Sequence, residues 1–228
     1  MSTRPVAGTS PLSLRRQVYK SLKDAVLSGD LKPGEIVSEI ELARQWEISR
    51  APIREAIRQL EQENLVRSSP RRSATVVGIT AASVRDLYEV REVLESLSAR
   101  LVALRATDLD LDAVEELSRG VEQTHDTDDY RSAIVVDDEL HRKLANSTRN
   151  RVLETQLARV LDRLMIARMM VRQEPGRLDD IGVEHRALIV ALRARDADAA
   201  AAAAALHVRN AGARLVDMLL RASVDDEG

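Results

Sequence analysis

Apolar residues in the first eighty positions follow helical spacing and then shorter extended runs. Leucine and valine recur every three or four residues over residues 12–28, which predicts a helix that Gly29 ends. Ser38 and Ser49 are favourable helix caps and predict two further helices directly after them. Residues 65–79 are predicted to form two short strands around a turn. Three helices followed by a hairpin are typical of a winged helix-turn-helix.

The pattern after Thr80 is helical throughout. Apolar spacing predicts six helices, at about residues 80–105, 108–125, 127–147, 149–173, 177–195 and 197–221. Five of the six prolines lie at or before Pro70, so helix-breaking residues are concentrated in the first part of the chain. We therefore expect a mainly α protein with four segments: a disordered arm over residues 1–11, a winged helix-turn-helix domain over 12–79, an all-helical bundle over 80–222 and a tail over 223–228.

Charge is unevenly distributed between these parts. Residues 1–78 hold 13 Lys/Arg and 9 Asp/Glu, a balance of +4, whereas residues 79–228 hold 21 and 28, a balance of −7. A basic head on an acidic body favours nucleic-acid binding by the head. Ordinary variation in surface charge would give the same numbers, so charge alone does not decide between the two interpretations.

Composition excludes several classes of protein. The chain has no cysteine, which rules out disulfides, thiolate zinc fingers and cysteine nucleophiles. No apolar run approaches the roughly 18 residues of a membrane helix. Met1–Ser13 lacks the apolar stretch of a signal peptide. We therefore expect a cytoplasmic protein without a membrane partner.

The third predicted helix carries two different faces. Its apolar face consists of Ile53, Ala56, Ile57 and Leu60, and a basic stripe at i, i+4 and i+8 consists of Arg50, Arg54 and Arg58. Such a helix suits the major groove of DNA, where an arginine can donate two hydrogen bonds to O6 and N7 of guanine. A solvated surface helix can carry the same stripe. The two preceding helices and the following hairpin favour DNA.

Three segments of the head resemble GntR-family transcription regulators: Leu31–Glu35, Ser38–Ala43 and Ile48–Leu60. The resemblance covers about residues 12–80. It implies that the operator is contacted by Ser49, Arg50, Ala51 and Arg54, with Arg58 on the same stripe. It also places the wing tip, with Arg71 and Arg72, along the adjacent DNA backbone or minor groove.

Some positions depart from the family pattern. Ala51 stands where the family usually has threonine, Ile40 stands where many members have arginine, and the wing lacks its usual glycine. These departures affect the operator sequence and not DNA binding itself. The expected partner is a short inverted repeat in double-stranded DNA, bound by a homodimer with one head on each half-site.

Spacing also allows three of the four histidines to meet in the body. Asp137 and His141 are four residues apart and can share one helix face. His185 and His207 lie eleven residues before and after Asp196, so an antiparallel hairpin turning there puts both about 16 Å from the turn. Three imidazoles and one carboxylate suit zinc or nickel, with manganese and iron as alternatives. Taken singly, each histidine is more simply a hydrogen-bonded structural residue.

The body resembles the FCD domain of the FadR subfamily over about residues 80–222. Asp137–Leu144 is similar to the D-x-x-F-H signature, with Leu140 in place of phenylalanine. The resemblance implies a metal site formed by Asp137, His141, His185 and His207. Six helices instead of seven indicate the shorter, VanR-like branch. Arg91 lies in the matching first helix and is a candidate for gripping a ligand carboxylate, although a surface pair with Glu95 at i, i+4 explains it equally well.

Three functional hypotheses follow. The first is a ligand-responsive transcription regulator, by default a repressor, whose effector is a small organic acid held by Arg91 and the metal, with zinc preferred over nickel and manganese. The second is a metal sensor in which the metal itself is the signal. The third, a metal-dependent hydrolase, is the weakest. It needs a general base beside a metal-bound water, whereas Glu139 and Glu184, which adjoin ligands in sequence, are expected to point away from them, and the head has no part in it. We expect no enzyme activity.

Overall fold

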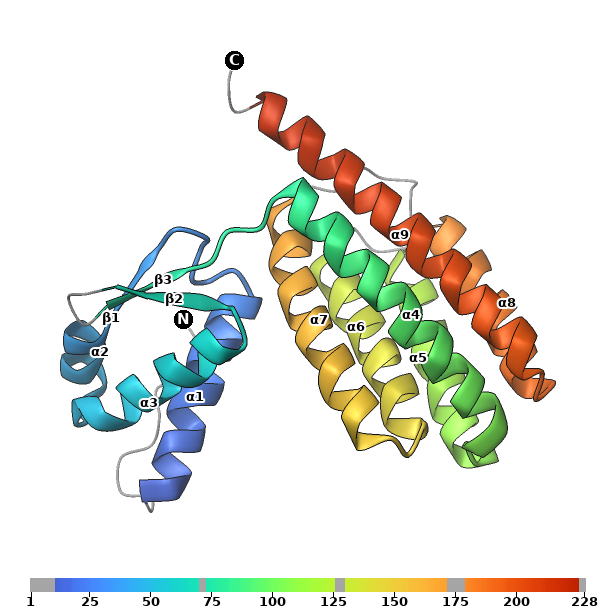
Figure 1. Cartoon of the computed structure of the whole chain (residues 1–228), viewed down its shortest axis with the longest axis horizontal. Helices are drawn as coiled ribbons and strands as arrows, with labels where there is room; N and C mark the ends of the chain where they lie inside the picture. The colour runs from blue at the N-terminus through green and yellow to red at the C-terminus, as the bar shows by residue number, and fades with distance from the viewer. Residues whose placement is uncertain (1–10, 70–72, 126–129, 172–178, 226–228) are drawn as a thin grey trace. The chain divides into compact units, whose positions relative to one another are not determined.

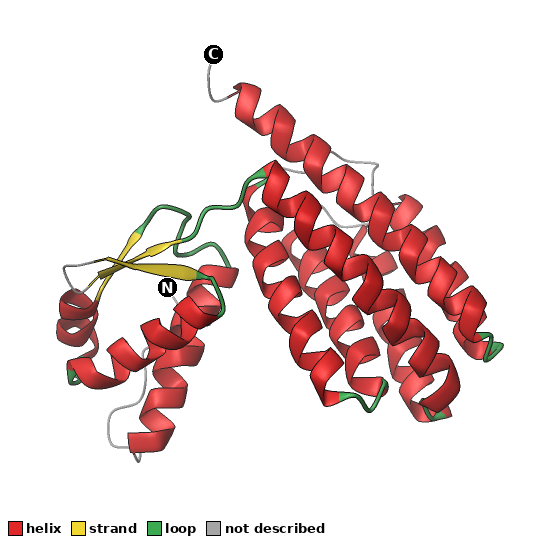
Figure 2. Cartoon of the chain, viewed as in Figure 1, coloured by secondary structure: helices red, strands yellow, loops and turns green. Residues whose placement is uncertain are grey.

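The computed structural model describes residues 11–69, 73–125, 130–171 and 179–225 (Figure 1). The chain divides into two compact units, residues 1–79 and residues 80–228. Helices make up most of both units, and the strands lie only in the first among the described residues (Figure 2). The mainly α fold is as predicted. Arg71 and Arg72, most of the predicted arm and the last residues of the predicted tail lie outside the described residues.

The first unit is a three-helix head with a small sheet. Its elements are α1 (Pro11–Leu27), β1 (Ile36–Ser38), α2 (Glu39–Trp46), α3 (Arg50–Gln62), β2 (Val66–Ser69) and β3 (Ser73–Val76). The sheet is antiparallel in the order β1-β3-β2. β1 was not predicted, because three residues are too few to show an alternating pattern. It pairs with β3 through Ile36 opposite Thr75 and makes the hairpin a three-stranded wing.

Helix boundaries in the head follow local chemistry. The Ser38 side chain caps α2 by accepting a hydrogen bond from the Glu41 N–H. Ser49 precedes α3 in an extended conformation, as a capping residue does, but its side chain makes no capping hydrogen bond. The start of α3 was therefore predicted correctly, and the side-chain cap was not. Gly29 follows α1 with a φ of 76°, a conformation that costs glycine little. The core between α1 and α3 is formed by Val18, Leu22, Val26, Ile53, Ile57 and Leu60.

The second unit is a bundle of six helices in its described part, the number predicted. They are α4 (Ala81–Arg105), α5 (Asp108–His125), α6 (Tyr130–Ser147), α7 (Arg151–Met170), α8 (Asp179–Arg193) and α9 (Ala197–Asp225). The Thr80 side chain caps α4, and the Asn150 side chain caps α7. α9 continues four residues past its predicted end, because the sequence offers no glycine or proline there.

The long helices α4 and α9 lie side by side (Figure 1). Gly212 makes this close approach possible, since a Cβ at that position would lie 2.8 Å from Cγ of Tyr88. α8 and α9 form the predicted antiparallel hairpin at Asp196, whose Oδ1 accepts hydrogen bonds from the N–H groups of Asp198 and Ala199. Two of the seven consecutive alanines, Ala200 and Ala204, are buried against the bundle core. The hairpin sets the level at which the histidines face each other.

No helix among the described residues combines the length and the apolar character needed to cross a membrane.

Candidate metal centre and DNA interface

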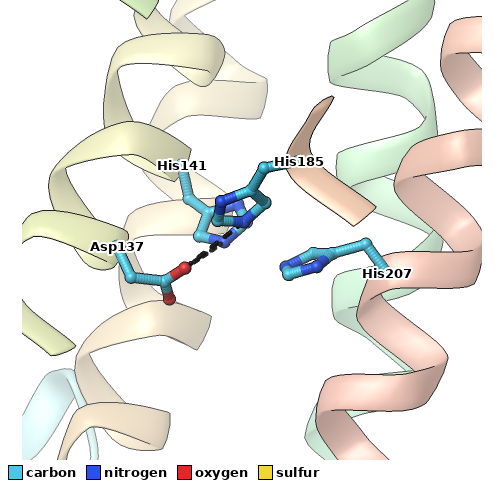
Figure 3. Close-up of side chains that lie close together, drawn as sticks. All are labelled: Asp137, His141, His185 and His207. Atoms are coloured by element: carbon cyan, nitrogen blue, oxygen red, sulfur yellow. Dashed lines mark ion pairs between the residues drawn. The ribbon is translucent and has the colours of Figure 1, made fainter. Parts of the chain in front are cut away.

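Four side chains from three helices meet inside the bundle (Figure 3). Asp137 and His141 come from α6, His185 from α8 and His207 from α9. Each offers one possible ligand atom, and these atoms lie within 4.8 Å of one another. All three imidazoles are buried. The structure thus brings together the four residues that sequence spacing had selected.

The atoms that converge are identifiable. Oδ1 of Asp137 lies 3.5 Å from Nε2 of His141 and 3.5 Å from Nε2 of His185. Nδ1 of His207 lies 2.9 Å from Oε2 of Glu184, which leaves Nε2 for the cluster. Asp137 Oδ1 and all three Nε2 atoms are buried and have no hydrogen-bond partner among the described residues.

Buried polar atoms without partners are rare and costly, so a cluster of four needs a physical reason. A divalent cation would satisfy these four at once, although not Nδ1 of His141 and Nδ1 of His185, which also have no hydrogen-bond partner among the described residues. Three imidazole nitrogens and one carboxylate oxygen form a donor set that zinc accepts, and nickel or manganese are the alternatives. The residues present therefore fit a metal ion.

Carboxylates lie behind two of the histidines, and one of them forms a hydrogen bond with the ring. Oε2 of Glu95 lies 2.7 Å from Nδ1 of His141, although without hydrogen-bond geometry. Glu184 holds His207, and it also accepts hydrogen bonds from Asn210 and Arg214 on α9. Such outer contacts fix ring orientation at metal sites.

The pKa shifts of three of the four residues favour metal ligation, and that of His141 opposes it. Burial tends to lower the pKa of His141, but the carboxylates of Glu95 and Asp137 raise it above its ordinary value, so a metal there competes with a proton. Burial tends to raise the pKa of Asp137, but the positive charges of His141 and Arg168 hold it well below its ordinary value. Burial and the neighbouring His207 push the pKa of His185 well below its ordinary value, and burial also lowers the pKa of His207. At neutral pH the carboxylate is charged and these two imidazoles are neutral, which are the forms that bind metal.

Arg91 makes the pair with Glu95 that its spacing allowed, but the prediction that this is a surface contact is wrong, because both side chains are buried inside the bundle. The Arg91 side chain is fully buried, with Nε paired to Oε1 of Glu95 and Nη1 donating to the Tyr88 hydroxyl at 3.3 Å. Nη2 is buried and has no hydrogen-bond partner among the described residues. The pair with Glu95 is therefore present, and one guanidinium nitrogen is still available to a ligand.

Sequence reasoning missed Arg168 on α7. Its Nη1 lies 2.8 Å from Oδ2 of Asp137, the carboxylate oxygen that does not face the histidines. The two residues are 31 positions apart on different helices, so no spacing rule links them. Arg168 fixes the Asp137 carboxylate and adds a second guanidinium near the cluster.

Helix α3 has the apolar and basic faces that were predicted. Ile53, Ala56, Ile57 and Leu60 are buried in the head, and Ser49, Arg50, Ala51 and Arg58 are exposed. Arg54 differs from the other arginines because it is paired with Glu39 of α2. Of the residues expected to contact DNA, Ser49, Arg50, Ala51 and Arg58 are thus exposed and Arg54 is half-buried, while Arg71 and Arg72 lie outside the described residues.

Comparison with known proteins identifies both units. Residues 14–76 match the family "Bacterial regulatory proteins, gntR family", and residues 86–210 match the FCD domain. The HTH-type transcriptional regulator YdhC of Bacillus subtilis is 30% identical over 185 residues, covering 81% of this chain and 83% of that protein. The chain belongs to the GntR family, with an FCD domain as its second unit.

Further similarities agree with this assignment. The gluconate operon transcriptional repressor of Bacillus subtilis is 26% identical over 197 residues, covering 84% of this chain and 81% of that protein. The structure of Escherichia coli McbR/YncC superposes with a TM-score of 0.80 at 23% identity, covering 89% of this chain and 97% of that one, and thereby shows the same fold. This GntR-family protein is a DNA-binding transcriptional regulator and not an enzyme, so the hydrolase hypothesis falls.

Proposed function

We propose that the protein is a homodimeric repressor whose affinity for its operator is controlled by a small carboxylate bound at a divalent metal, preferably zinc. The observation that carries the proposal is the set of four buried ligand atoms without hydrogen-bond partners among the described residues, together with the buried Nη2 of Arg91, which also has none. Glu95 contacts both Arg91 and His141 and so links the two. The set of ligand atoms fits a cation, and Nη2 of Arg91 fits an anion. Repression is the default because the similar gluconate operon regulator is a repressor.

In this proposal Asp137, His141, His185 and His207 hold the metal. When bound, the metal supplies a positive centre with coordination positions open to carboxylate oxygens. Nη2 of Arg91 donates to the same carboxylate, as guanidinium groups do well. A metal alone gives Arg91 no partner, since both are positive, and this favours the effector hypothesis over a metal sensor.

Arg91 also supplies a route from the site to the head. It lies on α4, which begins at Ala81, directly after the head ends at Ile79. An effector that draws Arg91 towards the metal acts on the helix that leads to the DNA-binding unit. It changes operator affinity only if it binds better to one arrangement of the heads than to the other.

An exposed apolar stripe on α4 supports the homodimer. It consists of Val90, Val93, Leu97 and Leu104, flanked by exposed Asp86 and by Arg100, which pairs with Asp198 of its own chain. Alternating spacings of four and three place these residues on one helix face. Two α4 helices pairing antiparallel about an axis at Val93 would set Asp86 opposite Arg100 of the partner subunit. The patch then complements itself, as an interface between identical surfaces requires.

The dimer is tested with Val93→Glu, which places two carboxylates at the proposed axis. We expect this variant to sediment as a monomer and to lose operator binding. Val190→Glu is the matched control, because Val190 on α8 is 69% exposed and Val93 is 68% exposed. A Val93→Glu protein that stays dimeric at micromolar concentration would rule out this interface.

The effector is tested by gel shift. A DNA fragment from upstream of the protein's own gene is titrated with zinc-loaded protein, with and without gluconate, citrate, lactate or acetate. We expect retardation that at least one carboxylate reduces in wild type and not in Arg91→Met. Retardation that follows free zinc without any acid would support the metal sensor instead. Failure to retard any promoter fragment would contradict regulation by DNA binding.

A further inference from the structure

Glu39 is the first residue of α2, and its carboxylate points to the recognition helix. Its side chain is only 8% exposed. It accepts hydrogen bonds from Arg54 at three atom pairs: Nε to Oε1 at 3.3 Å, Nε to Oε2 at 3.2 Å and Nη2 to Oε2 at 3.1 Å. The carboxylate thus lies along the Nε–Nη2 edge of the guanidinium.

This contact leaves the other edge of Arg54 without a hydrogen-bond partner among the described residues. A guanidinium has five N–H donors, and the pair with Glu39 uses the Nε hydrogen and one Nη2 hydrogen. Both Nη1 hydrogens and one Nη2 hydrogen remain, and they form the second fork of the group. The Arg54 side chain is 43% exposed, so its pairing with Glu39 does not bury it.

The other two arginines of the stripe are not held in this way. Arg58 is 65% exposed, and its contact with Glu55 is 3.9 Å long, an exposed pair that constrains it little. Arg50 is exposed at the first position of α3. A guanidinium held in one orientation suits the edge of a base, because two hydrogen bonds to a base require that orientation. Guanidinium groups that are not held suit phosphates, which accept hydrogen bonds from many directions.

We infer that Glu39 is a specificity-determining residue of the operator interaction: it holds Arg54 in the orientation that reads a guanine through its free fork. Arg50 and Arg58 then supply affinity that depends little on sequence. The inference rests on the proposed role of α3 as the DNA-reading helix. Glu39 is nearly buried and negatively charged, so it is not expected to contact DNA itself. Its role is to hold Arg54.

A purely structural role for the pair makes a different prediction. If Glu39 only links α2 to α3, its loss weakens the head and lowers binding to all DNA sequences in parallel. If Glu39 positions Arg54, its loss frees a half-exposed cation. Binding to unrelated DNA then stays the same or becomes tighter, since nonspecific affinity grows with positive charge. Preference for one base pair falls at the same time.

The experiment compares wild type with Glu39→Gln, which keeps the side-chain shape and removes the charge. Glu41→Gln is the matched control, because Glu41 is an exposed residue two positions further along α2 and the charge change is identical. Wild-type protein first selects duplexes from a random-sequence library at fixed salt. Affinities of all variants are then measured for the selected duplex, for each single base-pair substitution in it and for a scrambled duplex.

We expect Glu39→Gln to lose about tenfold of discrimination at one G·C pair in each half-site and to bind the scrambled duplex at least as tightly as wild type. Glu41→Gln should keep the wild-type preference at every position. Arg54→Lys keeps the charge but lacks the fork, and it should lose preference at the same pair. This variant tests the inference even if Glu39→Gln folds poorly.

Two results would overturn the inference while leaving regulation by DNA binding intact. One is a Glu39→Gln protein with full preference at every base pair. The other is a parallel loss of affinity for the selected and scrambled duplexes. Wild-type protein that selects no common sequence would overturn both the inference and the proposed function.

Discussion

Gly212 lies where α9 passes closest to α4, and replacing it with alanine tests that contact. The added Cβ would lie 2.8 Å from Cγ, 2.9 Å from Cδ1 and 3.1 Å from Cβ of Tyr88. Tyr88 is buried, and its hydroxyl and ring contact Arg91. The ring therefore cannot move away without disturbing the site, so the two helices must separate.

Two opposing contributions set the size of the effect. Alanine in place of glycine favours a helix by about 0.8–1 kcal/mol, whereas overpacking a buried contact costs about 1–3 kcal/mol. We expect Gly212→Ala to lower the free energy of unfolding by up to about 2 kcal/mol. Gly182→Ala is the control, since the three described atoms nearest to its Cβ would belong to the side chains of Arg186 and Glu122, at 3.3 Å or more. That variant should gain up to about 1 kcal/mol.

Urea denaturation followed by far-ultraviolet circular dichroism measures both variants, because the helical body dominates the signal. Effector binding by Gly212→Ala should weaken together with stability, since Tyr88 contacts Arg91. A Gly212→Ala protein stabilised as much as Gly182→Ala would show that α4 and α9 do not approach this closely in solution. The contact between Gly212 and Tyr88 described beside the site would then be incorrect.

Three further outcomes are expected. Leu140→Ala should lower the unfolding free energy by about 2–5 kcal/mol in urea, because Leu140 is fully buried in the bundle core. Burial tends to raise the pKa of Asp110, but hydrogen bonds from Thr107 and Lys143 lower it to about 2 from its ordinary 3.8. Because the pKa is lower in the folded protein, the charged carboxylate stabilises the fold above pH 4, and this contribution is lost as the pH falls towards 2. Asp110→Asn lacks it, so its urea midpoint should fall less than that of wild type between pH 4 and pH 2. Glu184→Gln should bind zinc about 10–100-fold more weakly in competition with a chelator; unchanged affinity would remove Glu184 from the site.

Part of the candidate metal site could be predicted from the sequence because it depends on regular helices. Counting eleven residues in each direction from Asp196 puts His185 and His207 at one level when both helices rise evenly and the turn is tight. That Asp137 and His141 join them was implied by the resemblance to the FCD domain and not by this count. The partners behind the ligands were not predictable in this way. Arg168 meets Asp137 through the packing of α7 on α6, and that packing depends on many side chains together.

The head shows the same division between local and tertiary information. The two faces of α3 follow from spacing within one helix and were predicted. The Glu39–Arg54 pair depends on how α2 crosses α3, and the two residues are 15 positions apart. β1 has only three residues and is recognisable as a strand only through its pairing with β3.

The metal content of the purified protein bears on every part of the proposed regulation. It is measured by inductively coupled plasma mass spectrometry for wild type, His185→Ala and His207→Ala, each checked for folding by circular dichroism. We expect about one zinc, nickel or manganese ion per wild-type chain, and little or none in either folded variant. Wild-type protein that is folded, metal-free and not stabilised by any of the three ions would contradict the metal centre and leave the histidines as structural residues.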